Sequence, residues 1–388
     1  MREEYILETI PVGPLGIIAL DSCIELGQKV DNYITGWRNK SESEQRHAIA
    51  FTGYHRDTYL MKSNVPRFGT GEAKGVIKES VRGHDLYIMV DVCNHSLTYK
   101  LFGKETHMSP DDHYQDLKRI IAAVAGKARV TVIMPFLYES RQHKRTARES
   151  LDCALALQEL VNMGVENILT FDAHDPRVQN AIPLKGFETI HPTYQFLKSL
   201  LNAKDDLKLD SDHMMIISPD EGGMNRALYF SNVMGIDMGM FYKRRDYTQI
   251  INGTNPIVAH EFLGSSVEGK DVLIIDDMIS SGDSMLEVAH ELKRRKANRV
   301  FVCTTFGLFT NGLEKFDKAY EEGAIDSVLT TNLVYQPQEL LDRPYYINVD
   351  MSKYISLIID TLNHDASISE LLNPVKKIQN LVADYKKK

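Results

Sequence analysis

Two adjacent carboxylates, Asp276 and Asp277, directly follow an apolar run at 272–275, and the segment SSGDS follows at 280–284. Carboxylates accept hydrogen bonds from sugar hydroxyls or bind magnesium, whereas hydroxyls and exposed backbone N–H groups bind phosphate oxygens. The combination predicts a cradle for a sugar phosphate, in which the acids hold the ribose diol and the turn holds the 5-phosphate. The alternative is that the acids only end a strand and that SSGDS is an ordinary turn.

A helix is expected to start inside this stretch and to direct its N-terminus at the bound group. Ser284 and Glu287 have the Ser-x-x-Glu spacing of a capping box, which predicts that the helix begins at Ser284. Its first N–H groups would then point at a phosphate, and this strand–turn–helix context favours the cradle over the ordinary turn. The predicted ligands of the sugar phosphate are Asp276, Asp277, Ser280, Ser281, Gly282, Asp283 and Ser284.

Other polar residues also follow apolar runs, and ligands in open α/β sheets bind beyond the carboxyl ends of the strands. His174 comes after the run at 167–171, and Asp220 belongs to the segment PDEGG that follows 214–218. The basic run SRQHKR at 140–145 follows a third apolar run. Each also has a purely structural interpretation, namely a buried histidine, a helix N-cap and a solvated loop.

Short apolar runs alternate along the chain with amphipathic helical patterns such as the one at 151–163. Runs this apolar suit parallel strands covered on both faces, and their alternation with helices predicts an α/β fold. The pattern divides near 186–195, which predicts two α/β halves. The expected strands are 16–20, 86–90, 130–134, 167–171, 214–218, 272–276, 300–304 and 327–331.

The composition narrows the class of protein. The chain has 388 residues, 43% hydrophobic and 25% charged, as is typical of a globular protein, and its net charge of −8 argues against a general nucleic-acid binder. The four cysteines form no CxxC pair, no apolar run approaches about 18 residues, and no secretory signal pattern is present. We therefore expect no disulfide framework, no membrane span and a cytoplasmic location.

Six motifs occur in the order found in the ribose-phosphate pyrophosphokinases, also called phosphoribosyl pyrophosphate synthetases. The chain resembles this family from about Phe68 to Asn332, and VLIIDDMISSGDS also resembles the phosphoribosyl pyrophosphate loop of type I phosphoribosyltransferases. Six motifs in register are far more specific than any one of them. They are KESVRGHDLYIM (78–89), SRQHKR (140–145), FDAH (171–174), SPDEGG (218–223), YKRR (242–245) and VLIIDDMISSGDS (272–284).

The resemblance implies two tandem doubly wound parallel-sheet domains of the type I phosphoribosyltransferase kind. We expect an N-terminal α/β domain on the ATP side at 1–188, with an insertion near 38–66. A C-terminal α/β domain at 189–349 would carry the ribose-phosphate loop and the mobile KRR loop. Residues 350–388 are expected to form a helix followed by a frayed, solvated polar tail.

The resemblance also assigns roles to single residues. Arg141 and Gln142 match the family's pair that contacts ATP, and a guanidinium suits bidentate contact with phosphate. In the family, the segment matched by Phe68 and Glu72 binds adenine at the active site of a neighbouring subunit, which implies a homo-oligomer built on dimers, with a hexamer as one form. The other matches are Lys243 and Arg245 as catalytic residues, His174 and Asp220 as metal ligands, and Ser80 and Arg82 at an allosteric phosphate site.

Several positions depart from the family pattern. Thr70 replaces an aspartate in the adenine segment, and Ser280 and Gly282 replace an aspartate and an alanine in the ribose-phosphate loop. Asp283 replaces a glycine, so its carboxylate would lie near the bound phosphate unless it turns away. None of these changes removes the expected catalytic charges.

The activity that the resemblance implies is transfer of pyrophosphate from ATP to the C1 hydroxyl of ribose 5-phosphate, with Mg²⁺ as cofactor, to give phosphoribosyl pyrophosphate and AMP. ATP and ribose 5-phosphate would be the small-molecule partners, without nucleic acid or membrane. Three alternatives stay open: a phosphoribosyltransferase, a pyrophosphokinase that acts on another ribosyl phosphate, and a non-catalytic regulatory homologue.

Overall fold

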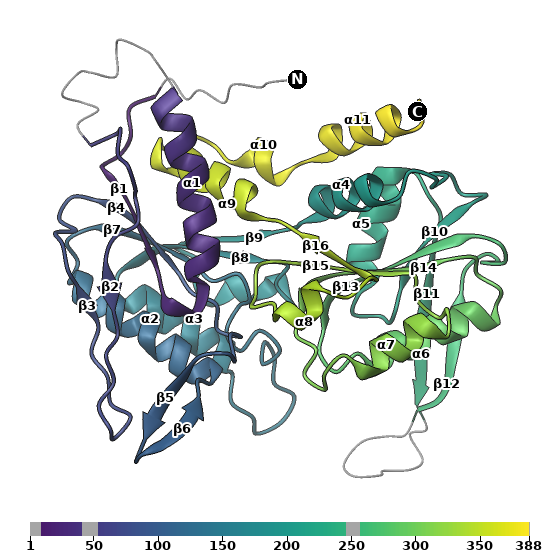
Figure 1. Cartoon of the computed structure of the whole chain (residues 1–388), viewed down its shortest axis with the longest axis horizontal. Coiled ribbons are helices and arrows are strands. Elements are labelled where there is room, and N and C mark those ends of the chain that lie inside the picture. Colours follow the sequence, from purple (N-terminus) through teal and green to yellow (C-terminus); the bar gives the residue numbers. More distant parts are fainter. Residues whose placement is uncertain (1–8, 41–52, 246–256, 388) are drawn as a thin grey trace. The chain divides into compact units, whose positions relative to one another are not determined.

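The computed structural model describes residues 9–40, 53–245 and 257–387, and in this part the chain divides into two compact units. Unit 1 contains residues 1–191 together with 332–335 and 350–372. Unit 2 contains residues 192–331, 336–349 and 373–388. The C-terminal residues are therefore shared between both units, and each unit is described by itself below (Figure 1).

The centre of unit 1 is a five-stranded sheet in the order β1-β4-β7-β8-β9, and all of its pairs are parallel. Alternate residues of a strand point to opposite faces, so a strand covered on both sides is apolar throughout. The buried strand β1 follows this rule, and β4 follows it after its first residue, Asp85. The bounds are β1 Leu15–Ala19, β4 Asp85–Met89, β7 Arg129–Ile133, β8 Val165–Phe171 and β9 Gly186–Ile190.

Helices cover both faces of this sheet, and two small hairpin-like pairs stand beside it (Figure 1). Leu117 of α2 and Leu157 of α3 pack in one core cluster with Ile88 of β4. The helices are η1 Asp21–Cys23, α1 Ile24–Lys40, α2 Pro110–Val124, α3 Asp152–Asn162, η4 Pro176–Ala181, α9 Ser352–Asn363 and α10 Ser369–Leu372. The small antiparallel pairs are β2 Ser63–Asn64 with β3 Val76–Ile77, and β5 Thr98–Leu101 with β6 Lys104–His107.

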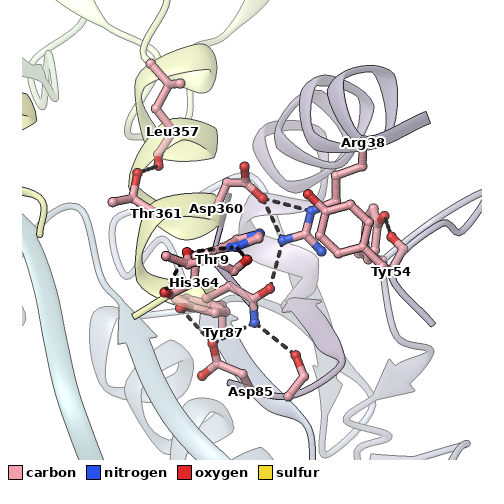
Figure 2. A network of polar contacts seen from close by, with 12 residues as sticks. Thr9, Arg38, Tyr54, Asp85, Tyr87, Leu357, Asp360, Thr361 and His364 are labelled. Carbon is pink, nitrogen blue, oxygen red and sulfur yellow. Dashed lines mark hydrogen bonds and ion pairs between the residues drawn. The ribbon is translucent and has the colours of Figure 1, made fainter. Parts of the chain in front are cut away.

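A buried polar network fastens α9 to the N-terminal part of unit 1 (Figure 2). The Arg38 guanidinium, 2% exposed, donates to Asp360 Oδ1 at 2.8 and 2.6 Å and to Asn363 Oδ1 at 2.8 Å. Asn363 in turn donates to Asp85 Oδ2 at 3.0 Å. Because buried charges are tolerated only when they are paired and hydrogen-bonded, this network specifies the docking of α9 against α1.

Unit 2 contains a seven-stranded sheet in the order β12-β11-β10-β13-β14-β15-β16, parallel except for the β11–β12 pair. The strands are β10 Met214–Ser218, β11 Met238–Arg245, β12 Ile257–Leu263, β13 Asp271–Ile279, β14 Val300–Gly307, β15 Ser327–Thr331 and β16 Tyr346–Val349. The helices are α4 Thr193–Ala203, α5 Met224–Met234, α6 Asp283–Arg294, α7 Glu314–Glu321, α8 Gln338–Leu341 and α11 Val375–Tyr385. One core cluster joins the central strands to α6 and α7.

The predicted fold class is confirmed, and every expected strand overlaps an observed one. The amphipathic pattern at 151–163 corresponds to α3. The strands that the sequence analysis did not single out include β9, which is only partly buried over most of its length, and the edge strand β12. Less buried and edge strands carry a weaker apolar signal, which explains why they were missed.

The expectation of a frayed, solvated C-terminal tail is wrong, because residues 375–385 form helix α11. Ile378 is fully buried, and Val382 is 7% exposed. The Tyr385 hydroxyl accepts from the N–H of Leu207 at 3.0 Å and donates to the Lys204 carbonyl at 2.7 Å. Apolar residues at helical spacing hold α11 on unit 2 despite its lysine-rich ends.

No helix within the described ranges combines the length and the apolar character needed to cross a bilayer. All four cysteines are free thiols, as expected. The predicted insertion near 38–66 lies partly outside the described residues, because 41–52 are not described.

Candidate functional site

The acidic doublet lies inside strand β13 and does not end it, because the strand continues to Ile279. The run at 272–275 is buried, and Asp276 pairs in register with Thr304 of β14. Successive side chains of a strand point to opposite faces, which separates the two acids. Asp277 is 4% exposed, whereas Asp276 is partly exposed.

The two carboxylates have different surroundings. Asp277 forms an ion pair with Arg226 of α5, with 3.6 Å between Nη2 and Oδ2 and both side chains largely buried. The residues described in unit 2 place no cation within ion-pair distance of Asp276, whose Oδ1 accepts from the N–H of Asp277 at 2.8 Å. Burial raises the pKa of Asp276 well above its usual range, and the neighbouring carboxylates of Asp277 and Asp220 raise it further. Asp276 is therefore the acid with capacity to bind a ligand or cation.

Asp220 is held at the adjacent end of β10. Its Oδ1 accepts from the N–H groups of Gly222 at 2.9 Å and Gly223 at 3.2 Å. The alternative that Asp220 is the N-cap is not borne out, since α5 begins at Met224 and its N-cap is Gly223. A Cβ at Gly223 would lie 3.3 Å from the carbonyl oxygen of Ile275, so this glycine allows close packing against β13.

The turn at 280–284 leads into α6, but the predicted capping box is wrong. The helix begins at Asp283, its N-cap is Gly282, and no side chain caps it, so Ser284 already belongs to the first helical turn. Gly282 has φ +86°, and a Cβ there would lie 2.4 Å from the ring of Phe316. Only glycine fits this conformation and this contact. The first backbone N–H groups of α6 have no partner within the helix and can therefore bind a ligand.

The substituted Asp283 turns toward a neighbouring cation. Lys315, in α7, forms an ion pair with its carboxylate, and both side chains are about half exposed. The Lys315 ammonium group lowers the pKa of Asp283, and a hydrogen bond involving Ser281 lowers it further. The negative charge that the substitution adds to the turn is thus balanced locally by Lys315.

Lys243 and Arg245 lie at the end of β11, where their backbones pair with His260 and Ile257 of β12. The register shifts between Arg244 and Arg245, as in a β-bulge. The side chains of these residues of the predicted mobile KRR loop lie outside the described part of the chain, as do residues 246–256, which follow them.

In unit 1, His174 follows β8 and packs against His143, with ring centroids 5.3 Å apart. His143 Nε2 lies 3.5 Å from Asp175 Oδ2, and its buried Nδ1 has no hydrogen-bond partner among the described residues. Arg177 lowers the pKa of Asp175 to about 2, so this carboxylate stays charged. In the sequence, His143 is only one member of the basic run at 140–145, and nothing in its spacing indicates this contact.

Arg141 and Gln142 line an open cavity of about 440 Å³ together with Lys144, Thr146, Glu149 and Ser150. Gln142 Nε2 donates to the Ser150 carbonyl at 2.9 Å, which closes the loop on itself. Two cations and several hydroxyl and amide groups face this space. Such a lining suits a polyphosphate.

Phe68 and Glu72 close a tight turn, in which the N–H of Phe68 donates to the Glu72 carbonyl at 2.7 Å. The Thr70 hydroxyl donates to the Glu72 carboxylate at 3.0 Å, and Phe68 is 55% exposed. Ser80 and Arg82 are also exposed, and the Ser80 hydroxyl accepts from the N–H of Arg82 at 3.4 Å. Each pair is local, and the structure does not bring the two pairs together with His174 into one described cluster.

Comparison with known proteins agrees with this arrangement. The N-terminal domain model of ribose phosphate pyrophosphokinase matches residues 15–164, and a phosphoribosyl transferase domain matches residues 188–333. The molecule thus combines two α/β domains of the phosphoribosyltransferase class, of which the second carries the acidic doublet and turn. The chain belongs to the ribose-phosphate pyrophosphokinase family.

Named relatives support this assignment. The ribose-phosphate pyrophosphokinase of Vibrio parahaemolyticus is 27% identical over 319 residues, which cover 81% of this chain and 92% of the relative. The enzyme of Ralstonia nicotianae is 28% identical over 284 residues, which cover 72% and 80%. The crystal structure of phosphoribosylpyrophosphate synthetase from Mycobacterium smegmatis shares the fold, with a TM-score of 0.71 and 18% identity over 91% of this chain and 99% of that one.

Proposed function

We propose that this protein is a ribose-phosphate diphosphokinase, which transfers pyrophosphate from ATP to the C1 hydroxyl of ribose 5-phosphate. The observation that carries the proposal is the continuous strand–turn–helix at 271–294. It places Asp276, which has no cation within ion-pair distance among the described residues of unit 2, ahead of a helix N-terminus whose N-cap is Gly282. The reaction itself is inferred from membership in the ribose-phosphate pyrophosphokinase family. The products are phosphoribosyl pyrophosphate and AMP.

Ribose 5-phosphate is held by unit 2. Asp276 accepts hydrogen bonds from the ribose diol. Asp277, on the opposite face of β13, donates its backbone N–H to the Asp276 carboxylate, and its own side chain pairs with Arg226. The N–H groups and serine hydroxyls at 280–284 hold the 5-phosphate, which the positive end of α6 favours. The pairing of Asp283 with Lys315 keeps the added carboxylate from repelling this phosphate.

ATP is held by unit 1. Arg141 and Gln142 face the open cavity that suits the triphosphate, and His174 stands at the end of β8 with His143 against it. Phe68 offers an exposed ring to the adenine, and Glu72 offers a carboxylate to its amino group. Ser80 and Arg82 are proposed to bind an allosteric phosphate.

The chemical step forms one bond and breaks another at the β-phosphorus. The C1 hydroxyl oxygen attacks the β-phosphorus in line, the bond to the oxygen that bridges the α- and β-phosphates breaks, and AMP leaves with that oxygen. The hydroxyl proton is released. Positioning and charge neutralisation dominate such transfers, and Lys243 and Arg245 are proposed to neutralise the transferred group.

Mg²⁺ is the proposed cofactor, held by Asp220 in unit 2 and, on ATP, by His174. The donor set fits, because burial and the neighbouring carboxylates of Asp277 and Asp220 raise the pKa of Asp276, and a cation would relieve the repulsion among these acids. Across 9–40, 53–245 and 257–387, no three or more His, Cys, Asp or Glu residues could hold a metal by themselves, which matches an ion that keeps water and phosphate ligands. When bound, the ion neutralises phosphate charge and acidifies the sugar hydroxyl.

The working form is proposed to be a cytoplasmic homo-oligomer built on dimers, whose nucleotide site lies near a subunit interface. The turn at Phe68 projects an exposed aromatic ring that a second copy could cover. The isolated monomer would then bind ATP weakly. Analytical ultracentrifugation of the purified protein at several concentrations measures its oligomeric state.

Mass spectrometry of the products from ATP and ribose 5-phosphate tests the proposed reaction. We expect AMP and phosphoribosyl pyrophosphate in equal amounts, dependent on both substrates and on Mg²⁺. Release of pyrophosphate from phosphoribosyl pyrophosphate with a base, but no AMP from ATP, would instead identify a phosphoribosyltransferase. Faster turnover of another ribosyl phosphate would change the assigned substrate, and binding without products would indicate a regulatory homologue.

A further inference from the structure

Strands β5 and β6 of unit 1 form a hairpin (Figure 1), and its loop contains a phenylalanine. Its two loop residues, Phe102 and Gly103, both have positive φ, at +47° and +79°. Two-residue hairpin loops of this kind favour Asn-Gly, and a bulky residue with positive φ is strained. The phenylalanine at this position thus adopts a conformation that its side chain disfavours, which points to a role for the ring itself.

The tip is joined to the turn that contains Phe68. The N–H of Phe102 donates to the Gly69 carbonyl at 2.8 Å. A Cβ at Gly71 would lie 2.8 Å from Leu101 Cδ1, so the turn packs on the hairpin without space for a side chain. The two segments therefore form one surface.

Arg67 fixes this surface to the body of unit 1. Its guanidinium lies 4.4 Å from the ring centroid of Tyr99 in β5 and 2.9 Å from Asp116 Oδ2 in α2. The Arg67 side chain is only 9% exposed. A largely buried arginine with a carboxylate and an aromatic partner is a rigid anchor, so the hairpin and the turn are pre-organised relative to each other.

The exposed phenylalanines of the described chain both lie on the surface formed by the 68–72 turn and the β5–β6 hairpin. Phe68 is 55% exposed and Phe102 is 78% exposed, and no other described phenylalanine is a large exposed side chain. Exposed charged residues lie on both segments, namely Glu72 on the turn and Lys100, Lys104 and Glu105 on the hairpin. Two aromatic rings bordered by a carboxylate and by ammonium groups match a purine nucleotide, whose base stacks, whose amino group donates and whose phosphates are anionic.

We propose that Phe102 is a second base-stacking residue for the purine of the nucleotide substrate, acting together with Phe68. The inference rests on the proposed function, in which the turn at 68–72 faces adenine. Phe102 extends the contact from one ring to two and gives the hairpin a part in nucleotide selectivity. The base is proposed to be the occupant because the charged border would oppose burial of the tip in an apolar protein interface.

Steady-state kinetics of Phe102 variants tests the role. Phe102→Leu keeps an apolar side chain of similar size but removes the aromatic face, and Phe102→Trp keeps the face. We expect Phe102→Leu to raise the KM for ATP about tenfold with kcat within about twofold, and Phe102→Trp to stay near the parent value. Leu184→Ala, which removes another highly exposed apolar side chain of unit 1, should change neither constant.

A binding measurement keeps the test independent of turnover. Quenching of the new indole in Phe102→Trp by a non-hydrolysable ATP analogue should be strong, whereas inorganic tripolyphosphate, which lacks a base, should cause little. Phe102→Leu should weaken binding of the analogue and leave that of tripolyphosphate unchanged. If the parent protein releases no AMP, the proposed function fails, and this titration still decides on Phe102.

Two results would overturn the inference. One is equal affinity of the parent and Phe102→Leu for the analogue. The other is the same equal affinity together with a change in the oligomeric state of Phe102→Leu, measured by sedimentation. That result would place the tip against a second copy of the chain.

Discussion

In unit 2, a single uninterrupted segment from β13 through the 280–284 turn to α6 carries the candidate ligands of the sugar phosphate. In unit 1, the candidate ligands of the nucleotide come from separate loops, at 68–72, at 141–142 and at His174. The first arrangement fixes its side chains through a buried strand. The second depends on local contacts such as the bond between Gln142 and Ser150.

This difference determines how each half responds to substitution. In unit 2 the candidate ligands of the sugar phosphate also contribute to the packing and the charge balance of the sheet, so one change is expected to alter both stability and binding. In unit 1 the candidate ligands of the nucleotide lie on loops between the helices and strands. Variants in unit 1 are therefore expected to change nucleotide binding with little loss of stability.

The largest stability effect is expected at the buried ion pair of unit 2. Arg226→Met removes one cationic partner of the buried Asp277, beside Asp276, which should lower the free energy of unfolding by about 3–5 kcal/mol. Denaturant unfolding measures the loss. The double variant R226M/D277N should recover most of it, and a single variant as stable as the parent would refute the assigned pairing.

Gly282→Ala is expected to act next most strongly. The new Cβ combines a positive φ with a 2.4 Å approach to Phe316, which should cost about 2–4 kcal/mol. The distorted turn should also weaken ribose 5-phosphate binding. Gly235→Ala is the matched control, because Gly235 has a similar φ but open space around it and should cost only about 1 kcal/mol. Equal losses at the two glycines would show that Phe316 does not restrict the turn.

Variants at His143 test the candidate nucleotide site of unit 1. Asn at this position retains a polar atom near that of Nδ1, whereas Phe retains only the ring that packs on His174. If Nδ1 serves the bound nucleotide, His143→Phe should weaken binding of an ATP analogue about tenfold and His143→Asn much less, with unchanged melting temperatures. Calorimetric titration separates these outcomes, and equal affinities for both variants would leave His143 a packing residue.

The smallest effect is expected at the exposed pair on the 280–284 turn. Lys315→Met should raise the KM for ribose 5-phosphate a few-fold at low salt, because the Asp283 charge is then uncompensated near the phosphate. The rise should shrink at high ionic strength, and D283G/K315M should restore the parent value. A KM independent of salt would mean that Asp283 does not influence the bound phosphate.

The same difference between the units explains what the sequence predicted. The doublet and turn of unit 2 are contiguous, so their grouping follows from one strand–turn–helix pattern. The continuation of β13 past Asp276, the glycine cap of α6 and the partner Arg226 depend on packing against other elements, which local spacing does not specify. In unit 1 the contact of His143 with His174 joins two separate loops, and in unit 2 the helix α11 depends on contacts with α4 and α5.

The central claim is that Asp276 and the adjoining turn bind ribose 5-phosphate, and calorimetric titration of this sugar into parent and Asp276→Asn protein, with Mg²⁺, tests it most directly. Asn keeps the size of the side chain and removes its charge. We expect the parent to bind ribose 5-phosphate saturably and the variant, which remains folded, to bind it with an affinity about 100-fold lower. Equal affinity of the two proteins, or no binding by the parent, would contradict it.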